Sequence, residues 1–418
     1  MVLILYTLAI RGYLTAARVF ALFNYKANAW LLGQEHYKTV DLSGLRGDKV
    51  VWFHCASVGE FEQARPVIER QKEIDPSIRV LLTFFSPSGF ELRKDYSFAD
   101  CITYLPIDLP NNVTAFLDRF KPDAVVFIKY ELWFNFIIGI NRRSIPMALI
   151  CANFPENHLL LRPFFHWFLI QLEGLSTIHV QNKETQLRLE SHGLKNVQLA
   201  GDTRTERVIE VASLPFRDKD VESFIGQYPV LVIGSFWVSD AAILMQEIQN
   251  TENLKIIVVP HELSAINQSS WYKGFGSEIF LWSERGDSDI SNKKVLYIDC
   301  IGLLSRMYRY ATIAYVGGGF GSSVHNTLEA AIYGVPVIFG PNNKRFYEIQ
   351  ELKRFGSGFE IKSQFEFRET MNRLMIDESL RKSIAQRNQQ YFLENQGATE
   401  KALNWIKVEL EHKKSPLG

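Results

Sequence analysis

A glycine-rich stretch in the second half of the chain has the residue types of a phosphate-binding loop. Gly317, Gly318 and Gly319 follow an apolar run, 311–316, that is typical of a buried strand, and the segment 328–333 predicts a short helix soon after. In such a unit the free N–H groups at the helix start and its positive dipole end attract a phosphate. Glycine lets a ligand approach the backbone, but a tight turn needs glycine too. The spacing leaves both interpretations open.

Glu329 lies one turn into this predicted helix, where its carboxylate is suited to bind a diol such as a ribose. Asn326 stands three residues earlier, which is the spacing of a capping box. A purely structural role for this pair is therefore the alternative to a nucleotide site.

Glu60 is the strongest candidate for a general base. It follows a strand-like apolar run, 50–56, and the turn formed by Ser57, Val58 and Gly59. A helix N-terminus favours the ionised carboxylate whereas burial in a cleft favours the protonated one, and a balance between the two suits proton abstraction. Ser57 and Glu60 also have capping-box spacing, so a structural role is again the alternative.

Three more polar side chains follow predicted strands, and each has two interpretations. Glu131 either takes part in catalysis or is a carboxylate stabilised by a helix start, and we favour the second. Arg204 either clamps an anion bidentately or is a surface charge. His261 either meets a phosphate or lies in a solvated turn. Metal ligands at familiar spacing are absent from the sequence, so no metal is expected.

Apolar strands alternate with helices along the whole chain. The first series runs from residue 50 to 201 and the second from 230 to 339, with a more polar joint at 211–228. Uninterrupted apolar strands separated by helices indicate parallel sheets covered on both faces. We therefore predict an α/β protein with two doubly wound, Rossmann-like domains facing each other across a cleft. The predicted parts are an N-terminal helix (1–33), an N-terminal domain (34–214), a C-terminal domain (215–395) and a helix packing back on the first domain (396–418).

Length and composition exclude several classes. A chain of 418 residues is too long for one ordinary core, which favours two domains. The 46 basic and 46 acidic residues cancel, which argues against a protein that coats nucleic acid. The four cysteines are scattered without C-x-x-C, which indicates reduced residues of a cytosolic protein rather than disulfides or zinc ligands.

Residues 2–32 predict an apolar helix with one narrow polar stripe. No uninterrupted apolar run approaches the roughly 20 residues needed to span a bilayer. We expect this helix to lie in a membrane interface, with Arg11, Arg18 and Lys26 meeting anionic head groups. The alternative is a helix buried against its own domain.

Several motifs taken together resemble the 3-deoxy-D-manno-octulosonic acid (Kdo) transferases of lipopolysaccharide synthesis. The resemblance covers nearly the whole chain in order, and its two most specific blocks are S-V-G-E and H-N-x-L-E. The motifs are His54 to Glu60, Tyr130 to Trp133, Gln181 to Glu184, Gly317 with Gly318, His325 to Ala331, Gly334 to Val337 and Phe339 to Pro341.

The resemblance implies a glycosyltransferase-B fold, which here would be accompanied by a membrane-associated N-terminal helix. It implies transfer of Kdo from CMP-Kdo to an anionic lipid A precursor similar to lipid IVA, on the cytoplasmic face of the bacterial inner membrane. CMP-Kdo would be a substrate, and no cofactor, metal or nucleic acid would take part. We expect inversion, because the acceptor hydroxyl attacks from the face opposite the leaving phosphate in one displacement. The phosphate already leaves easily, so no second carboxylic acid is required.

The resemblance also implies roles for single residues. Glu60 would be the general base, and Ser57, Gly59, Glu131 and Arg204 would support the acceptor or the transition state. Donor-binding residues would be Ser235, Pro260, His261, Ile301, Gly302, Leu303, Gly317, Gly318, His325, Asn326, Thr327, Leu328 and Glu329.

Two of these segments depart from the family's pattern. Pro260-His261-Glu262 stands where the family has Pro-Arg-His, and Ile301-Gly302-Leu303 stands where it has Met-Gly-Glu. An arginine contact and a carboxylate are therefore missing or come from elsewhere, while Arg204 keeps the charge of the family's lysine.

Three other functions remain as alternatives. A transferase of the same fold would use a UDP- or GDP-sugar, and a non-catalytic membrane scaffold would bind lipid and nucleotide without turnover. A nicotinamide oxidoreductase would need G-x-G-x-x-G in its first strand–helix turn, which Ser57 to Glu60 does not match.

Overall fold

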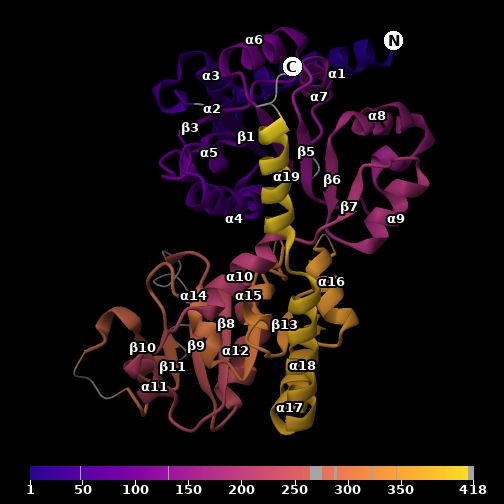
Figure 1. The fold of residues 1–418 in the computed structure, drawn as a ribbon. Helices are drawn as coiled ribbons and strands as arrows, with labels where there is room; N and C mark the ends of the chain where they lie inside the picture. The colour runs from indigo at the N-terminus through magenta and orange to yellow at the C-terminus, as the bar shows by residue number, and fades with distance from the viewer. Residues whose placement is uncertain are drawn as a thin grey trace. The chain divides into compact units, whose positions relative to one another are not determined.

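The computed structural model describes residues 1–47, 49–129, 131–263, 275–286, 290–321, 323–344 and 346–412. The chain divides into two compact α/β units, each built on its own parallel sheet (Figure 1). Met1–Glu206 and Asn395–Gly418 form the N-terminal unit, and Arg207–Glu394 forms the C-terminal unit. The division falls inside α10 (Thr203–Ser213), close to the polar joint seen in the sequence. The predicted fold class of two doubly wound parallel sheets is confirmed.

The described part of the N-terminal unit holds a seven-stranded sheet with the order β3-β2-β1-β4-β5-β6-β7. The winding reverses between β1 and β4, which pair directly, with Trp52 opposite Val125. Ligands of doubly wound sheets bind outside the carboxyl ends of the strands at such a reversal, so the segments after β1 and β4 are candidate site segments. The strands are β1 (Val50–Cys55), β2 (Arg79–Phe84), β3 (Cys101–Tyr104), β4 (Ala124–Ile128), β5 (Met147–Ala152), β6 (Thr177–Val180) and β7 (Val197–Leu199).

Helices cover both faces of this sheet. The helices of this unit are α1 (Val2–Ala21), α2 (Tyr25–Gly33), α3 (His36–Thr39), α4 (Val58–Ile74), α5 (Pro87–Arg93), α6 (Pro110–Phe120), α7 (Phe134–Arg142), α8 (His166–Ile170), α9 (Lys183–Ser191), the start of α10 and α19 (Ala398–His412). Successive residues of β1 point to opposite faces. Trp52 packs on Phe116 of α6, while Phe53 belongs to the other core with Phe61 of α4 and Ile406 of α19. The C-terminal helix therefore completes the core of the N-terminal unit.

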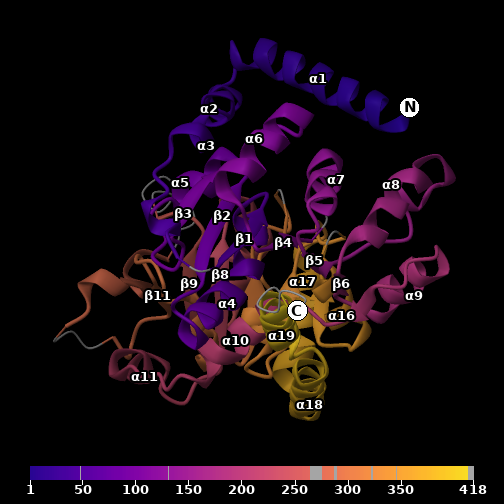
Figure 2. The same ribbon diagram turned by 45° about the horizontal axis from the view of Figure 1, so that its top comes forward.

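The N-terminal segment forms two helices rather than one. The first ends at Ala21, and Asn24 caps the second, because its side chain accepts the N–H of Ala27 at 3.1 Å. No residue of α1 is buried, so the alternative of a helix buried in its own domain does not apply. With 20 residues α1 is long and apolar enough to cross a membrane, which corrects the expectation that no segment approaches that length. Figure 2 shows α1 along the outer edge of the unit, beyond α2 and α6.

The described part of the C-terminal unit holds a second seven-stranded parallel sheet, with the order β10-β11-β9-β8-β12-β13-β14. Its winding reverses between β8 and β12, where Gly234 pairs with Val316. The segments after these two strands therefore occupy the binding position of this sheet. The strands are β8 (Val230–Phe236), β9 (Lys255–Pro260), β10 (Ile279–Leu281), β11 (Val295–Tyr297), β12 (Ile313–Val316), β13 (Val337–Phe339) and β14 (Gly358–Glu360).

Helices also cover both faces of the second sheet. Leu231 and Ile233 of β8 belong to one core, and Val230 and Val232 belong to the other. Successive residues of β8 therefore point to opposite faces of the sheet, as they do in β1. The helices are α11 (Lys219–Ile225), α12 (Val238–Asn250), α14 (Leu304–Met307), α15 (Leu328–Ala331), α16 (Tyr347–Arg354), α17 (Gln364–Ile376) and α18 (Glu378–Glu394).

Candidate active site

Glu60 lies in the first turn of α4, directly after the carboxyl end of β1. Ser57 is the N-cap residue of that helix: its Oγ accepts the N–H of Gly59 at 3.2 Å, and its hydroxyl donates to the Glu60 carboxylate. Only 14% of the Glu60 side chain is exposed. The three predicted residues are thus brought together, with the carboxylate held beside the helix cap at the reversal of the sheet.

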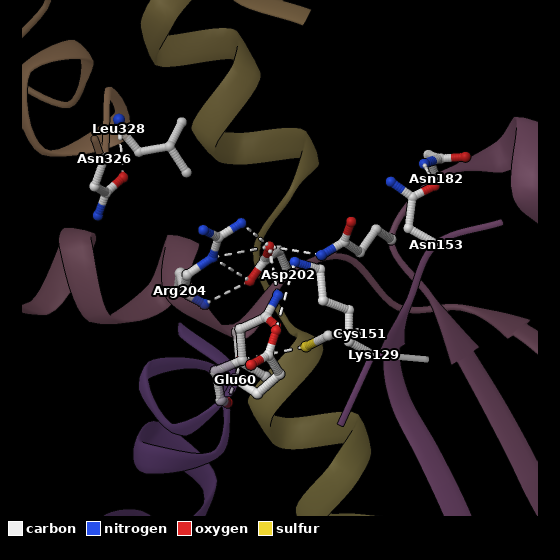
Figure 3. Close-up of polar contacts among 12 residues, drawn as sticks. Glu60, Lys129, Cys151, Asn153, Asn182, Asp202, Arg204, Asn326 and Leu328 are labelled. Carbon is white, nitrogen blue, oxygen red and sulfur yellow. Dashed lines mark hydrogen bonds and ion pairs between the residues drawn. The ribbon is translucent and has the colours of Figure 1, made fainter. Parts of the chain in front are cut away.

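Lys129 supplies a cation beside Glu60 that we did not predict. Its Nζ lies 3.9 Å from Oε1 of Glu60, and Figure 3 shows the two side chains together. Lys129 follows β4 with a φ of 69°, a left-handed conformation that is costly for residues other than glycine and is frequent at functional positions. The position of Lys129 at the end of a strand could have indicated a site residue. Its left-handed backbone conformation could not be recognised from the sequence.

Glu131 follows the same strand and contacts different groups. Its Oε2 accepts the Nε1–H of Trp133 at 3.1 Å and lies 3.8 Å from Nε2 of the buried His54. Burial raises the pKa of Cys55 at the end of β1, and the negative charges of Glu60 and Glu131 raise it further. Both carboxylates therefore lie near one strand end, and the contacts of Glu131 favour the supporting role over the catalytic one.

Arg204 is bound to Asp202 and is not a free surface charge. Its Nη2 lies 2.6 Å from Oδ2 of Asp202, and its Nε lies 3.2 and 3.1 Å from the two oxygens. Burial opposes ionisation of Asp202, but the charge and hydrogen bonds of Arg204 outweigh it and lower the pKa of Asp202. Gln63 donates to Asp202 at 3.0 Å. Because Gln63 follows Glu60 by one helical turn, the Asp202–Arg204 pair lies along the same face of α4 (Figure 3).

The glycine loop of the C-terminal unit lies against the end of β8. A Cβ at Gly317 would lie 2.2 Å from the carbonyl oxygen of Ser235, so only glycine fits there. Ser235 has a φ of 49° at a register shift of β8. Asp240, another residue that we did not predict, joins the two strand ends: its Oδ2 accepts the N–H of Gly318 at 3.2 Å and that of Trp237 at 2.9 Å. The loop is thus fixed by a buried carboxylate.

Several N–H groups of this loop donate inside the protein. Gly317 donates to Gly234 at 2.9 Å, and His325 donates to Gly317 at 3.2 Å. The helix that follows, α15, has only four residues, so its dipole is small. For these positions the predicted array of free N–H groups aimed at a phosphate is wrong.

Three flat rings stack beside the loop. The ring centroids of Trp237 and His261 are 4.3 Å apart with an interplanar angle of 18°, and those of His261 and His325 are 4.4 Å apart. Nε1–H of Trp237 donates to Nε2 of His325 at 3.0 Å. Burial, together with the nearby His261, lowers the pKa of His325 to about 4. The His325 ring is therefore neutral at pH 7, with its proton on Nδ1. Trp237 was not predicted as a site residue, because a tryptophan before a helix is typical of an ordinary core.

Asn326 and Glu329 are bound to each other. Nδ2 of Asn326 donates to Oε1 of Glu329 at 3.0 Å, and its Oδ1 accepts the N–H of Leu328 at 3.1 Å. Thr327 is fully buried, and its Oγ1 has no hydrogen-bond partner among the described residues. Thr327 and not Asn326 is the N-cap residue of α15, so the capping box is not formed. The Asn326 contact holds the Glu329 carboxylate in place, and a role in binding stays a prediction.

The remaining predicted donor residues lie further along the same sheet edge. Pro260 ends β9 beside His261 and pairs with Phe236 of β8. Ile301 is 89% exposed, Gly302 has a φ of +94°, and Leu303 caps α14. These three follow β11, which is separated from β8 by β9. Tyr130, which belongs to one of the predicted motifs, lies outside the described residues.

A family model and several curated proteins similar to this chain are Kdo transferases. Residues 32–207 match a family model described as 3-deoxy-D-manno-octulosonic-acid transferase (kdotransferase). The 3-deoxy-D-manno-octulosonic acid transferase of Aquifex aeolicus is 29% identical over 346 residues, which cover 80% of this chain and 87% of that protein. The enzyme of the same name from Haemophilus influenzae is 24% identical over 384 residues, covering 86% and 87%.

One solved structure illustrates the fold. MurG of Acinetobacter baumannii has a TM-score of 0.58 and 14% identity to this chain, and the match covers 86% of this chain and 100% of MurG. At this identity the likeness concerns the arrangement of strands and helices alone, and it agrees with the two doubly wound sheets described above.

Proposed function

We propose that this chain, a glycosyltransferase related to the Kdo transferases over most of its length, transfers Kdo from CMP-Kdo to a lipid A precursor in lipopolysaccharide biosynthesis. The relatives support the sugar and the type of reaction. At the level of residues, one observation carries the proposal: Ser57, Glu60 and Lys129 meet at the point where the N-terminal sheet reverses its winding.

Glu60 acts as the general base in this proposal. It accepts the proton of an acceptor hydroxyl while that oxygen attacks the anomeric carbon of Kdo. The bond from this carbon to the phosphate oxygen of CMP breaks, CMP leaves with the electron pair, and the configuration inverts. The Nζ of Lys129 lies 3.9 Å from this carboxylate and places a positive charge beside it. A well-placed base contributes about 10²- to 10⁴-fold to the rate.

The C-terminal unit binds the CMP part of the donor in this proposal. The stacked rings of Trp237, His261 and His325 offer flat apolar surface at the binding position of the sheet. The Glu329 carboxylate, held by Asn326, is suited to accept hydrogen bonds from the ribose hydroxyls. CMP carries no diphosphate, so the leaving group does not demand magnesium, and this absence of a metal remains a prediction.

The N-terminal unit binds the acceptor and the membrane in this proposal. The apolar α1 is suited to anchor the chain at the cytoplasmic face of the bacterial inner membrane, either across it or in its interface. Arg11, Arg18 and Lys26 supply positive charge for the phosphates of a lipid A precursor and for anionic head groups.

Product analysis tests the proposal. The full chain is supplied with CMP-Kdo and a tetraacylated disaccharide bisphosphate, and the lipid is then examined by mass spectrometry. We expect a mass gain of one or more Kdo residues. We also expect CMP to raise the melting temperature and UDP or GDP to leave it unchanged. Stabilisation by UDP or GDP without Kdo transfer would indicate another donor, and lipid binding without any turnover would indicate a scaffold.

A further inference from the structure

An apolar cavity of about 900 Å³ lies in the N-terminal unit between α1, α2 and the segment after β2. Its walls are formed by Ala17 and Phe20 of α1, Phe23, Ala27 and Trp30 in and before α2, and Phe85. Ligand cavities of roughly 300–1,000 Å³ typically hold one drug-sized molecule. Of the residues that line this cavity, only Lys26 has a role in the function proposed above.

The cavity borders the segments that carry Glu60. The ring of Phe85 lies 4.8 Å from that of Trp133, whose Nε1–H donates to Glu131 at 3.1 Å. The N–H of Ser86, which also lines the cavity, donates at 2.8 Å to the carbonyl of Ala56, the residue before Ser57. The cavity wall and the candidate active-site segments are therefore directly bonded neighbours at one edge of the sheet.

The surroundings of the cavity match an anionic amphiphile. Phe20 and Phe23 are 58% and 85% exposed, and exposed apolar side chains gathered at one place mark a binding surface. Lys26 lines the same cavity. An apolar chain with a phosphorylated head satisfies both features, because the chain covers the rings while the phosphate meets the Lys26 ammonium.

We infer that this cavity binds one acyl chain of the acceptor lipid and so positions the acceptor sugar at the Glu60 segment. The inference rests on the proposed function and adds to it a subsite and a source of specificity. The acceptor is chosen over a bulk membrane lipid because the cavity wall is bonded to the Ala56–Ser57 segment. A chain seated there places its own head group at the candidate base.

Filling the cavity tests this inference. Ala17→Trp and Ala27→Leu place bulk into it from two different helices, and Ala9→Trp adds the same bulk on an exposed part of α1 outside the cavity. We expect both cavity variants to raise KM for the tetraacylated disaccharide bisphosphate at least tenfold and to leave KM for CMP-Kdo unchanged. Ala9→Trp should change neither value. Shortening the acyl chain should weaken wild-type binding by about fourfold for each methylene that leaves the cavity.

Binding of the tetraacylated disaccharide bisphosphate, measured by calorimetry, separates this inference from the proposed function. Binding that the cavity variants weaken tenfold supports the cavity even if the wild type transfers no Kdo, a result that would refute the function alone. Equal effects of Ala17→Trp and Ala9→Trp would show a general membrane effect and overturn the inference. Equal losses with the acylated and the de-acylated acceptor would overturn it as well.

Discussion

Nζ of Lys129 lies 3.9 Å from Oε1 of Glu60, and Lys129 holds this position with a left-handed backbone conformation. Lys129→Met should lower kcat by about 10- to 100-fold, because the Glu60 carboxylate loses the positive charge that lies 3.9 Å away and holds it in position. KM for CMP-Kdo should stay the same. Lys121→Met is a matched control, since Lys121 also has a positive φ but lies exposed at the end of α6. Steady-state kinetics that show equal effects of the two variants would contradict this role.

Gly317→Ala should disrupt the donor site. Its Cβ would meet the carbonyl oxygen of Ser235 at 2.2 Å, so the loop and β8 must move apart. We expect a loss of about 1–3 kcal/mol in unfolding free energy and at least tenfold weaker CMP binding. Gly12→Ala is the control, because nothing lies within 4 Å of the added atom. Calorimetric titration with CMP measures the effect, and unchanged affinity would place the nucleotide away from this loop.

Tyr6→Phe should loosen α1 from the rest of the N-terminal unit. The Tyr6 hydroxyl donates at 2.7 Å to Asp108, a fully buried carboxylate that also accepts the N–H groups of Asn135 and Phe136. Removing one donor from a buried carboxylate costs about 1–3 kcal/mol. Faster proteolysis within α1 is the expected readout. Tyr25→Phe, at an 85% exposed ring, should leave the rate unchanged, and a rate for Tyr6→Phe equal to wild type would exclude this anchoring contact.

His325 should make stability depend on pH below neutrality. Its pKa is lowered to about 4, whereas an unfolded histidine titrates near 6.5, so the unfolded state binds more protons between these values. Stability is therefore complete above about pH 6.5 and falls as the pH is lowered toward 4. His325→Asn keeps an acceptor for Trp237 but cannot be protonated. The difference between urea midpoints at pH 7.5 and pH 5 should be smaller in this variant, and an equal difference would refute the assignment.

The strands were predictable because they are buried on both faces. Ala124–Ile128 can be recognised in the sequence, since five consecutive apolar residues between polar ones are typical of a central parallel strand. Cys101–Tyr104 was missed, because this edge strand is shorter and includes polar Thr103. The break of the N-terminal helix at Asn24 was also missed, although an asparagine before a helical segment is a capping signal.

The site was predictable only in part. Their spacing after a strand makes Glu60 and Ser57 recognisable in the sequence, and the structure brings the two residues together. Lys129 and Asp240 act across the sheet, through strand neighbours far apart in the chain, and single-sequence patterns do not contain strand order. The N–H groups of the glycine loop looked free because their partners, Gly234 and Asp240, belong to another strand and helix.

The rate of Kdo transfer by Glu60→Gln tests the central claim most directly. Glutamine keeps the size of the side chain and a hydrogen-bond acceptor for Ser57 but cannot accept the proton, so kcat should fall by about 10²- to 10⁴-fold. CMP affinity should be unchanged. Glu62→Gln, which removes a charge from the same helix at a more exposed position, should stay within about threefold of wild type. If Glu60→Gln also stays within about threefold of wild type, Glu60 is not the base and the proposed mechanism is contradicted.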